Sequence, residues 1–175
     1  PSVDSLLYSV KKYEEIIKKK FDYIIELPCV APLRDSKFVD LAIQKIFRTN
    51  SDSVISYVDT GEKHPIRLKR ISGSKVTNFC KEYPEIEKKS FRQNFEPSFI
   101  RNGAIYCMTR KCLLDNKTRI GKKAFPIIMP MEKSINIDEK FDLLTVKYLI
   151  ENGHSNNRPI KVVSNQTFLN SKKKI

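Results

Sequence analysis

An amide and a carboxylate stand two residues apart at a point where the sequence pattern changes its period. Residues 134–138 alternate polar and apolar side chains, so an extended chain places Asn136 and Asp138 on the same side. Helical spacing follows at once in Phe141, Leu144, Thr145, Tyr148 and Leu149. In open α/β sheets, ligands bind where the strands end. The pattern therefore predicts a strand over 134–138 that carries Asn136 and Asp138 to a binding edge.

A structural interpretation of the same stretch stays open. Asp138 stands where the N-cap of the following helix is expected, and Asp is a common N-cap residue. Asn136 would then be an ordinary surface residue of the strand. In that interpretation neither side chain meets a ligand.

Arginines near turns form a second group of candidates. Arg34 ends a loop with two prolines, and Arg92 and Arg101 precede the dipeptide Asn102-Gly103. Guanidinium groups bind carboxylates or phosphates through two parallel hydrogen bonds. Asn-Gly allows a tight backbone turn beside a ligand, after which residues 104–106, ending in Tyr106, re-enter the sheet. Alternatively, Arg34 makes a structural ion pair, Asn102-Gly103 is a plain turn and Tyr106 belongs to the core.

The remaining pattern predicts the elements that position these residues. Short apolar runs at 21–27, 51–58 and 125–129 indicate strands, and we expect 21–27 to be a buried strand of a parallel sheet. Amphipathic spacing predicts one helix before residue 18 and another that Asp35 or Ser36 caps. Helices alternating with strands favour right-handed βαβ units.

Two segments interrupt this alternation. Residues 66–97 are charged, contain Gly73, Pro84 and Pro97, and predict an excursion from the sheet. Residues 154–175 are polar apart from the run 160–163, and we expect a C-terminal tail of low order.

Composition narrows the class of protein. A chain of 175 residues with 40% hydrophobic content predicts one globular domain. No run reaches the length of a membrane span and no signal-peptide pattern is present, so we expect a cytoplasmic protein without a membrane partner. The four cysteines form no C-x-x-C pair, which favours reduced and buried or inert thiols in an intracellular protein.

The net charge of +13 admits several partners. The basic residues are scattered in twos and threes and match no zinc-finger, RNP or basic-zipper signature, so we expect no nucleic-acid partner. A solvated lysine-rich surface explains the charge, and a nucleoside triphosphate substrate is equally compatible with it.

Two motifs resemble the acylneuraminate cytidylyltransferases, the enzymes that make CMP-activated nonulosonic acids such as CMP-sialic acid. The first is Met129-Pro130 followed by residues 132–134 and then 136–142, although Asn136 stands in the place of the family's first Asp. The second is Arg92-Gln93 followed by residues 99–106, in which Arg101 directly precedes Asn102. Pro32-Leu33-Arg34 also matches a strand-end loop of the family, without its Gln. The resemblance covers residues 1–153.

The resemblance implies a fold, a reaction and roles for residues. The fold is a three-layer, mostly parallel α/β sheet of the Rossmann-like nucleotidyltransferase type, in which residues 66–97 form an arm that pairs two subunits into a homodimer. The reaction transfers CMP from CTP to the anomeric hydroxyl of a nonulosonic acid with release of pyrophosphate. Asp138, and more weakly Asn136, would be the catalytic ligands of Mg²⁺, which prefers oxygen. Substrate binding would fall to Arg34, Arg92, Arg101, Asn102 and Tyr106.

The match also has a gap. The family begins with a strand and a Gly- and Lys/Arg-rich loop that cradles the triphosphate, whereas the five glycines here form no such cluster. We therefore expect an N-terminally truncated chain, which lacks the first βα units and is inactive as a fragment. Two other hypotheses stay open: a non-catalytic α/β remnant that dimerises and binds ligand weakly or not at all, and, from charge alone, a nucleic-acid-binding module.

Overall fold

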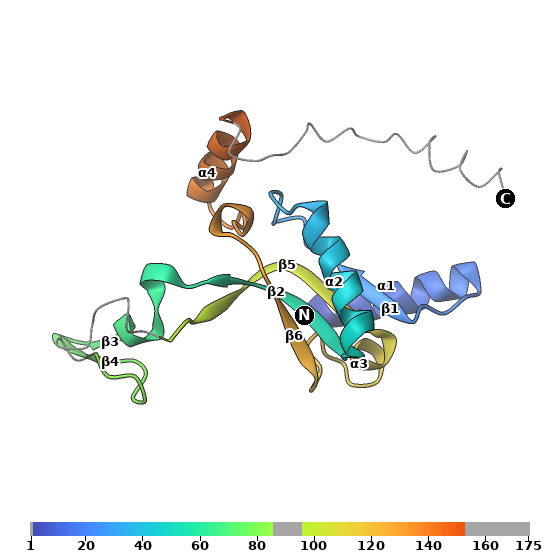
Figure 1. The fold of residues 1–175 in the computed structure, drawn as a ribbon, viewed down its shortest axis with the longest axis horizontal. Helices are drawn as coiled ribbons and strands as arrows, with labels where there is room; N and C mark the ends of the chain where they lie inside the picture. Colours follow the sequence, from blue (N-terminus) through green and yellow to red (C-terminus); the bar gives the residue numbers. More distant parts are fainter. Residues whose placement is uncertain (1, 86–95, 153–175) are drawn as a thin grey trace.

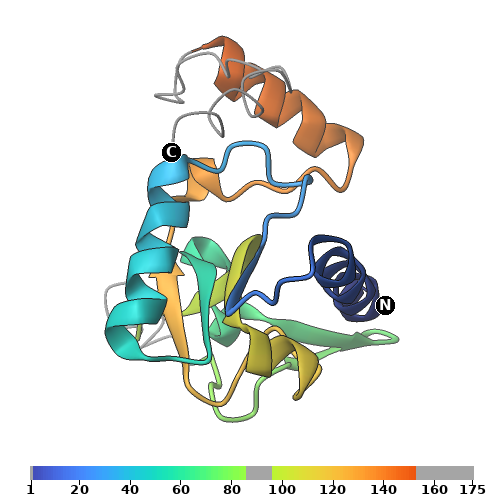
Figure 2. The same cartoon turned by 90° about the vertical axis from the view of Figure 1, so that its right-hand side faces the viewer.

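The computed structural model describes residues 2–85 and 96–152, in which a four-stranded sheet carries helices on both faces (Figures 1 and 2). The strand order is β1-β5-β2-β6. The predicted α/β class is confirmed, and so are strands in each of the three expected runs. The strands of the sheet are β1 (Tyr23–Glu26), β2 (Ser53–Asp59), β5 (Phe99–Thr109) and β6 (Ala124–Ile128).

The sheet is mixed: β1, β2 and β6 run in one direction, as a mostly parallel sheet requires, and β5 runs in the opposite direction between β1 and β2. Only β2 and β6 pair in parallel, whereas β5 runs antiparallel to both β1 and β2. The direction of β5 follows from the path of the chain: after β2 the chain makes an excursion, in whose described residues there is no crossover helix, and it returns beside β2. The expectation that 21–27 is a buried strand is wrong, because β1 lies at an edge of the sheet and only Ile24 of it is buried. β1 pairs antiparallel with β5 and therefore runs parallel to β2, two strands away.

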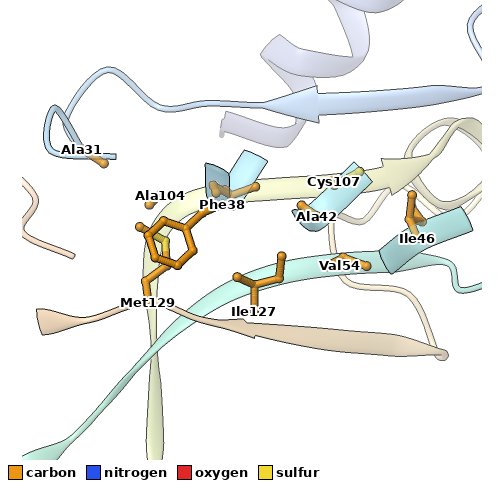
Figure 3. Close-up of a cluster of buried hydrophobic side chains, with 10 residues drawn as sticks. Ala31, Phe38, Ala42, Ile46, Val54, Ala104, Cys107, Ile127 and Met129 are labelled. Atoms are coloured by element: carbon orange, nitrogen blue, oxygen red, sulfur yellow. The ribbon is translucent and has the colours of Figure 1, made fainter. Parts of the chain in front are cut away.

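Helix α2 (Ser36–Thr49) covers one face of the sheet. Asp35 is its N-cap, as one of the two expected alternatives had it, and its carboxylate accepts a hydrogen bond from the Lys37 backbone N–H at 3.1 Å. Figure 3 shows side chains of α2 packed against β2, β5 and β6. The buried members of this cluster are Ala31, Phe38, Ala42, Ile46, Val54, Ala104, Ile105, Cys107, Ile127 and Met129.

Helices α1 (Ser2–Ile17) and α3 (Arg110–Leu114) cover the opposite face. The period-2 alternation of β5 divides its side chains between the two faces, with Ile105 toward α2 and Tyr106 toward α1 and α3. The cluster on this second face consists of Val10, Ile24, Ile55, Tyr106, Met108, Cys112 and Leu113. The helix–sheet–helix layering agrees with the three layers that the resemblance implies.

The excursion between β2 and β5 forms its own small sheet. Two 3-10 turns, η1 (Gly61–Lys63) and η2 (Pro65–Arg67), lead to the hairpin of β3 (Lys69–Ser72) and β4 (Lys75–Asn78). The hairpin stands apart from the main sheet (Figure 1). An excursion within residues 66–97 is therefore confirmed over its described part, while its role in dimerisation stays a prediction.

The segment after β6 differs from the expected strand. It forms η5 (Met131–Lys133), a stretch without ladder pairing over 134–139, and α4 (Lys140–Glu151). The predicted strand over 134–138 is therefore wrong. Phe141 and most other apolar side chains of α4 are exposed, and Val146 is its one buried residue (Figure 1 shows α4 projecting from the sheet).

The two edges of the main sheet differ in protection. On β6, Pro126 has no N–H to offer, and its carbonyl accepts a hydrogen bond from Lys45 Nζ at 2.7 Å. On β1, no second strand pairs with the outer side among the described residues.

Within the described part of the chain, no helix has the length and apolar character to cross a membrane. The predicted tail at 154–175 lies outside the described residues.

Candidate functional site

A bulge in the middle of β5 gives the candidate site its shape. Ile55 pairs with Tyr106 and Tyr57 with Arg101, so β5 advances five residues where β2 advances two. Gly103 takes a left-handed conformation within the extra residues, with φ +70°. The tight turn predicted at Asn102-Gly103 is therefore wrong: both residues belong to β5, and the turn signal marks a bulge inside the strand.

Asn102 holds the bulge from inside the protein. Its side chain is 4% exposed, and its Oδ1 accepts hydrogen bonds from Ser56 Oγ at 2.5 Å and from the Ala104 backbone N–H at 3.2 Å. Its Nδ2 donates to Ser134 Oγ at 2.8 Å and contacts Met129 Sδ at 3.5 Å. Both ends of the Asn102 amide therefore contact protein atoms, and this buried side chain stabilises the backbone of the site from the protein interior.

Ser134 and Asn136 attach the segment after β6 to the same bulge. Asn136 Nδ2 donates a hydrogen bond to the Asn102 backbone carbonyl at 2.8 Å. The alternating side chains at 134 and 136 thus face one way, as an extended chain requires, but they contact Asn102 instead of lining a paired strand. This contact explains why the alternation looks strand-like in the sequence.

The side-chain oxygen of Asn136 is unusual. Oδ1 is buried and has no hydrogen-bond partner among the residues that the structure describes. The bond from Nδ2 to Asn102 fixes which end of the amide points inward. A buried acceptor without a donor costs roughly 1–3 kcal/mol, so this oxygen favours any rearrangement that brings a donor to it.

Asp138 lies on the exposed side of the same segment and does not cap α4. Glu139 is the N-cap residue and forms a capping box with Asp142, whose carboxylate accepts hydrogen bonds from the backbone N–H groups of Asp138 and Glu139 at 3.1 and 2.8 Å. The interpretation of Asp138 as the cap is therefore wrong. Its carboxylate remains on the surface, two residues from Asn136.

Arg34 ties a third segment to the bulge. Its guanidinium donates to the carbonyls of Pro28 and Ala104 at 3.1 and 2.8 Å, and burial lowers its pKa. Val30 in the same loop accepts a hydrogen bond from the Ile137 backbone N–H at 2.8 Å. The loop after β1, the bulge of β5 and the segment over 134–138 therefore meet in one place. They must do so if the sequence motifs that they carry belong to a single site.

The side chain of Tyr106 forms the α1-facing part of the site. A Cβ atom at Gly103 would lie 3.9 Å from the Tyr106 hydroxyl and 3.2 Å from Asn136 Nδ2, so these two groups approach the same point of the bulge. The guanidiniums of Arg101 and Arg119 lie over the Tyr106 ring at 5.8 and 5.3 Å from its centroid. Arg101 is exposed.

The described residues could hold a metal ion only together with a bound substrate, which would supply the remaining ligands. They contain no group of three or more His, Cys, Asp or Glu side chains that could hold a metal ion. One surface carboxylate, Asp138, and one buried neutral oxygen, that of Asn136, are too few ligands for a site made of protein alone. Mg²⁺ commonly binds one or two carboxylates together with phosphate oxygens of a substrate, and Asp138 fits that arrangement.

The thiols agree with the expectation of free cysteines. Burial raises the pKa of Cys107 to about 11 and also raises the pKa of Cys112, so both thiols stay protonated and inert at neutral pH. Cys29 differs because it is exposed in the loop that follows β1.

The structure brings most of the predicted site residues together. Arg34, Arg101, Asn102, Tyr106 and Asn136 all lie at or beside the bulge, Asp138 follows on the surface, and Arg92 lies outside the described residues. Sequence reasoning missed Ser56, Glu26 and Arg119. A serine within an apolar strand was the one available signal for Ser56, and no local pattern pointed to the other two.

Comparison with known proteins finds distant relatives. The chain is 28% identical over 152 residues to the post-translational flagellin modification protein B of Campylobacter coli. It is 25% identical over 120 residues to the N-acylneuraminate cytidylyltransferases of Streptococcus agalactiae serotypes V and III. No family model matches the chain. The resemblance to acylneuraminate cytidylyltransferases that the motifs predict is thereby confirmed at low identity.

The match is unequal in length. It covers 85% of this chain and 59% of the Campylobacter protein, and 69% of this chain and 28% of each streptococcal enzyme. The chain therefore spans between about a quarter and three fifths of the curated relatives that it matches.

Proposed function

From its similarity to acylneuraminate cytidylyltransferases, we propose that this chain carries the sugar-acid side of a cytidylyltransferase site. The reaction would transfer CMP from CTP to the anomeric hydroxyl of a nonulosonic acid and release pyrophosphate. The observation that carries the proposal is the meeting of three segments at the β5 bulge, because it joins both sequence motifs in one place.

In this proposal, the role of each side chain follows from whether its polar groups already bind protein atoms. Arg101 would meet the carboxylate of the sugar acid, and the Tyr106 hydroxyl would position the sugar beside Gly103. Asn102 and Arg34 would hold the backbone that carries these groups, since their donors and acceptors already bind protein atoms. Arg92 would add a second cation.

Mg²⁺ would be held by Asp138 together with phosphate oxygens of CTP. Its charge would offset the negative charge that builds up as pyrophosphate leaves. Asn136 offers a neutral oxygen in the place where the family has an Asp, and its amide is fixed to Asn102. We therefore assign Asn136 a supporting role next to the ion instead of a place among its charged ligands.

A calorimetric titration tests the proposal. The chain is titrated with CTP in the presence of Mg²⁺ and separately with N-acetylneuraminate, and pyrophosphate release is measured with both substrates present. We expect Asp138→Asn to weaken Mg²⁺-dependent CTP binding by about tenfold or more, since a metal ligand is lost. Asp40→Asn, which removes an exposed carboxylate from α2, is the matched control and should bind as the unaltered chain does.

The outcomes separate the hypotheses. Absence of binding to both CTP and N-acetylneuraminate would refute the proposal and favour the non-catalytic remnant. Binding without pyrophosphate release would agree with the expectation that this fragment does not complete the reaction. Equal CTP affinity of the Asp138 and Asp40 variants would remove Asp138 from the metal site.

We also propose that the chain forms a homodimer through the hairpin of β3 and β4. The hairpin stands apart from the main sheet and exposes Ile71 and Val76 at 74% and 63%. These two residues are directly paired across the hairpin, so they form one apolar patch. An isolated two-stranded hairpin is marginally stable in water, and a partner surface would stabilise it.

A further inference from the structure

A bidentate ion pair lies against the one buried aromatic ring of the candidate site. Arg119 comes from the loop between α3 and β6, and both Nε and Nη2 donate to the carboxylate of Glu26, with Nη2 at 2.8 Å from Oε1. The side chains of Arg119 and Glu26 are only 17% and 20% exposed. Such a geometry is much more specific than a surface ion pair.

The register of the sheet places this pair next to Tyr106. Glu26 and Tyr106 are direct partners in the ladder between β1 and β5, so their side chains share the α1-facing side. Glu26 thereby brings the Arg119 guanidinium over the Tyr106 ring, 5.3 Å from its centroid. The ring belongs to the second hydrophobic cluster and is 8% exposed.

The two arginines over this ring differ in their charge balance. The charge of Arg119 is compensated by Glu26, which keeps its guanidinium in place. Arg101 is exposed, and no carboxylate of the described residues lies within ion-pair distance of it. Only Arg101 can therefore leave the ring to meet an anion at little electrostatic cost.

The Tyr106 hydroxyl projects from this fixed ring toward the bulge. It lies 3.9 Å from the position that a Cβ atom of Gly103 would take, and no hydrogen bond joins it to the described residues. It is also absent from the buried polar atoms without partners, of which Asn136 Oδ1 is the sole example in the described part of the chain. The hydroxyl is thus held in position and still open to a ligand.

We propose that Arg119, fixed by Glu26, is a positioning residue that locks the Tyr106 ring so that its hydroxyl stays beside Gly103 to bind the ligand. The inference rests on the proposed function for the identity of that ligand, a sugar acid. Arg119 itself does not touch the ligand. Its loss should weaken ligand binding by releasing the ring, with little change in the fold.

The ion pair of Glu14 and Arg110 supplies a matched control. It is also bidentate, with both distances 3.0 Å, and it also joins one element to another on the same face of the sheet. No contact of Arg110 with Tyr106 is among its described interactions. Arg110→Ala and Arg119→Ala therefore remove equivalent pairs, of which only one reaches the Tyr106 ring.

Two measurements test the inference. Ring-flip rates of carbon-13-labelled tyrosines are measured by NMR, with the Tyr106 signals assigned through Tyr106→Phe, and affinity for N-acetylneuraminate is measured by calorimetry. We expect Arg119→Ala to speed the Tyr106 flip and weaken binding, each by about tenfold, the effect of one partly buried cation–aromatic contact. Arg119→Lys should recover part of both losses, and Arg110→Ala should change neither.

Each outcome decides one question. An unchanged flip rate in Arg119→Ala, or a faster flip with unchanged binding, would overturn the positioning role. Equal effects of Arg110→Ala and Arg119→Ala would mean that both ion pairs only stabilise the fold, which would also overturn the positioning role of Arg119. If the unaltered chain binds neither CTP nor N-acetylneuraminate, the proposed function fails, while a flip that Arg119→Ala alone accelerates would still support the lock on the ring.

Discussion

Gly103 concentrates two constraints in one residue, and each can be measured. Its φ of +70° disfavours any side chain, and a Cβ atom would stand 3.2 Å from Asn136 Nδ2. Gly73 in the turn between β3 and β4 has a φ of +58°, but a Cβ atom there would meet no heavy atom within 4 Å. The two glycines thus share the backbone constraint and differ in the contact.

Substitution of both glycines by alanine separates these constraints. Gly73→Ala should cost about 1–2 kcal/mol of unfolding free energy, the penalty of a left-handed conformation. Gly103→Ala should cost more, because Asn136 must also move and its bond to Asn102 weakens. Urea denaturation measures both. Equal losses would mean that Asn136 adjusts freely and that the site is softer than the contacts indicate.

At the scale of elements, α1 is held to the sheet by a charged contact as well as by apolar packing. The Glu14 carboxylate accepts hydrogen bonds from Arg110 and from the Phe21 backbone N–H, the latter at 3.0 Å. These contacts lower its pKa from 4.5 to about 2, with the Arg110 hydrogen bonds as the largest cause. The carboxylate therefore favours the folded state as long as it is ionised.

This contact predicts how stability depends on pH. Because the pKa of Glu14 is lower in the folded state, its stabilising contribution is complete above pH 4.5 and is lost as the pH falls toward 2. Melting temperatures measured between pH 6 and pH 2.5 should fall more steeply for the unaltered chain than for Glu14→Gln. Parallel curves for the two proteins would show that the pair does not hold α1.

The helices α2 and α4 predict opposite responses to truncation. Ile46 of α2 is fully buried among β2, β5 and β6, so Ile46→Ala should cost about 2–5 kcal/mol. Phe141 of α4 is 75% exposed, so Phe141→Ala should change stability by less than about 0.5 kcal/mol. Denaturation curves of the two variants check this. A large loss for Phe141→Ala would mean that a further surface covers α4.

Sequence periodicity predicted most elements but not their neighbours. The strands at 23–26, 53–59 and 124–128 and the helices α1, α2 and α4 lie where the pattern placed them, because burial of one face imposes the period. Pairing direction depends on the path of the chain between strands, which periodicity does not record. The alternation at 134–138 misled for a related reason: two side-chain contacts with Asn102 imitate the period of a strand.

The candidate site was predictable only in part, for the same physical reason. Asn102, Tyr106 and Asn136 were found because each lies within a short contiguous motif of the sequence. Glu26 and Arg119 are 93 residues apart, and they meet because β1 pairs with β5 and the loop before β6 reaches the same place. Local sequence carries no information on such a contact.

At the scale of the whole molecule, the hairpin of β3 and β4 is the feature that predicts assembly. If its apolar patch forms the dimer interface, Val76→Asp should convert a dimer into a monomer in light scattering at micromolar concentration, because a charge would be buried opposite Ile71. Phe141→Asp on exposed α4 is the control and should leave the mass unchanged. A monomeric mass for the unaltered chain would contradict the dimer.

The unequal edges of the sheet limit how far copies of this chain can polymerise. A filament built by strand addition needs two receptive ends on every copy, so that each newcomer offers a fresh template. Here Pro126 and Lys45 block the edge strand β6, and among the described strands only the edge strand β1 can still pair with another strand. Strand addition would therefore terminate once two β1 edges had joined, and overcrowded solutions should yield small closed aggregates in preference to fibres.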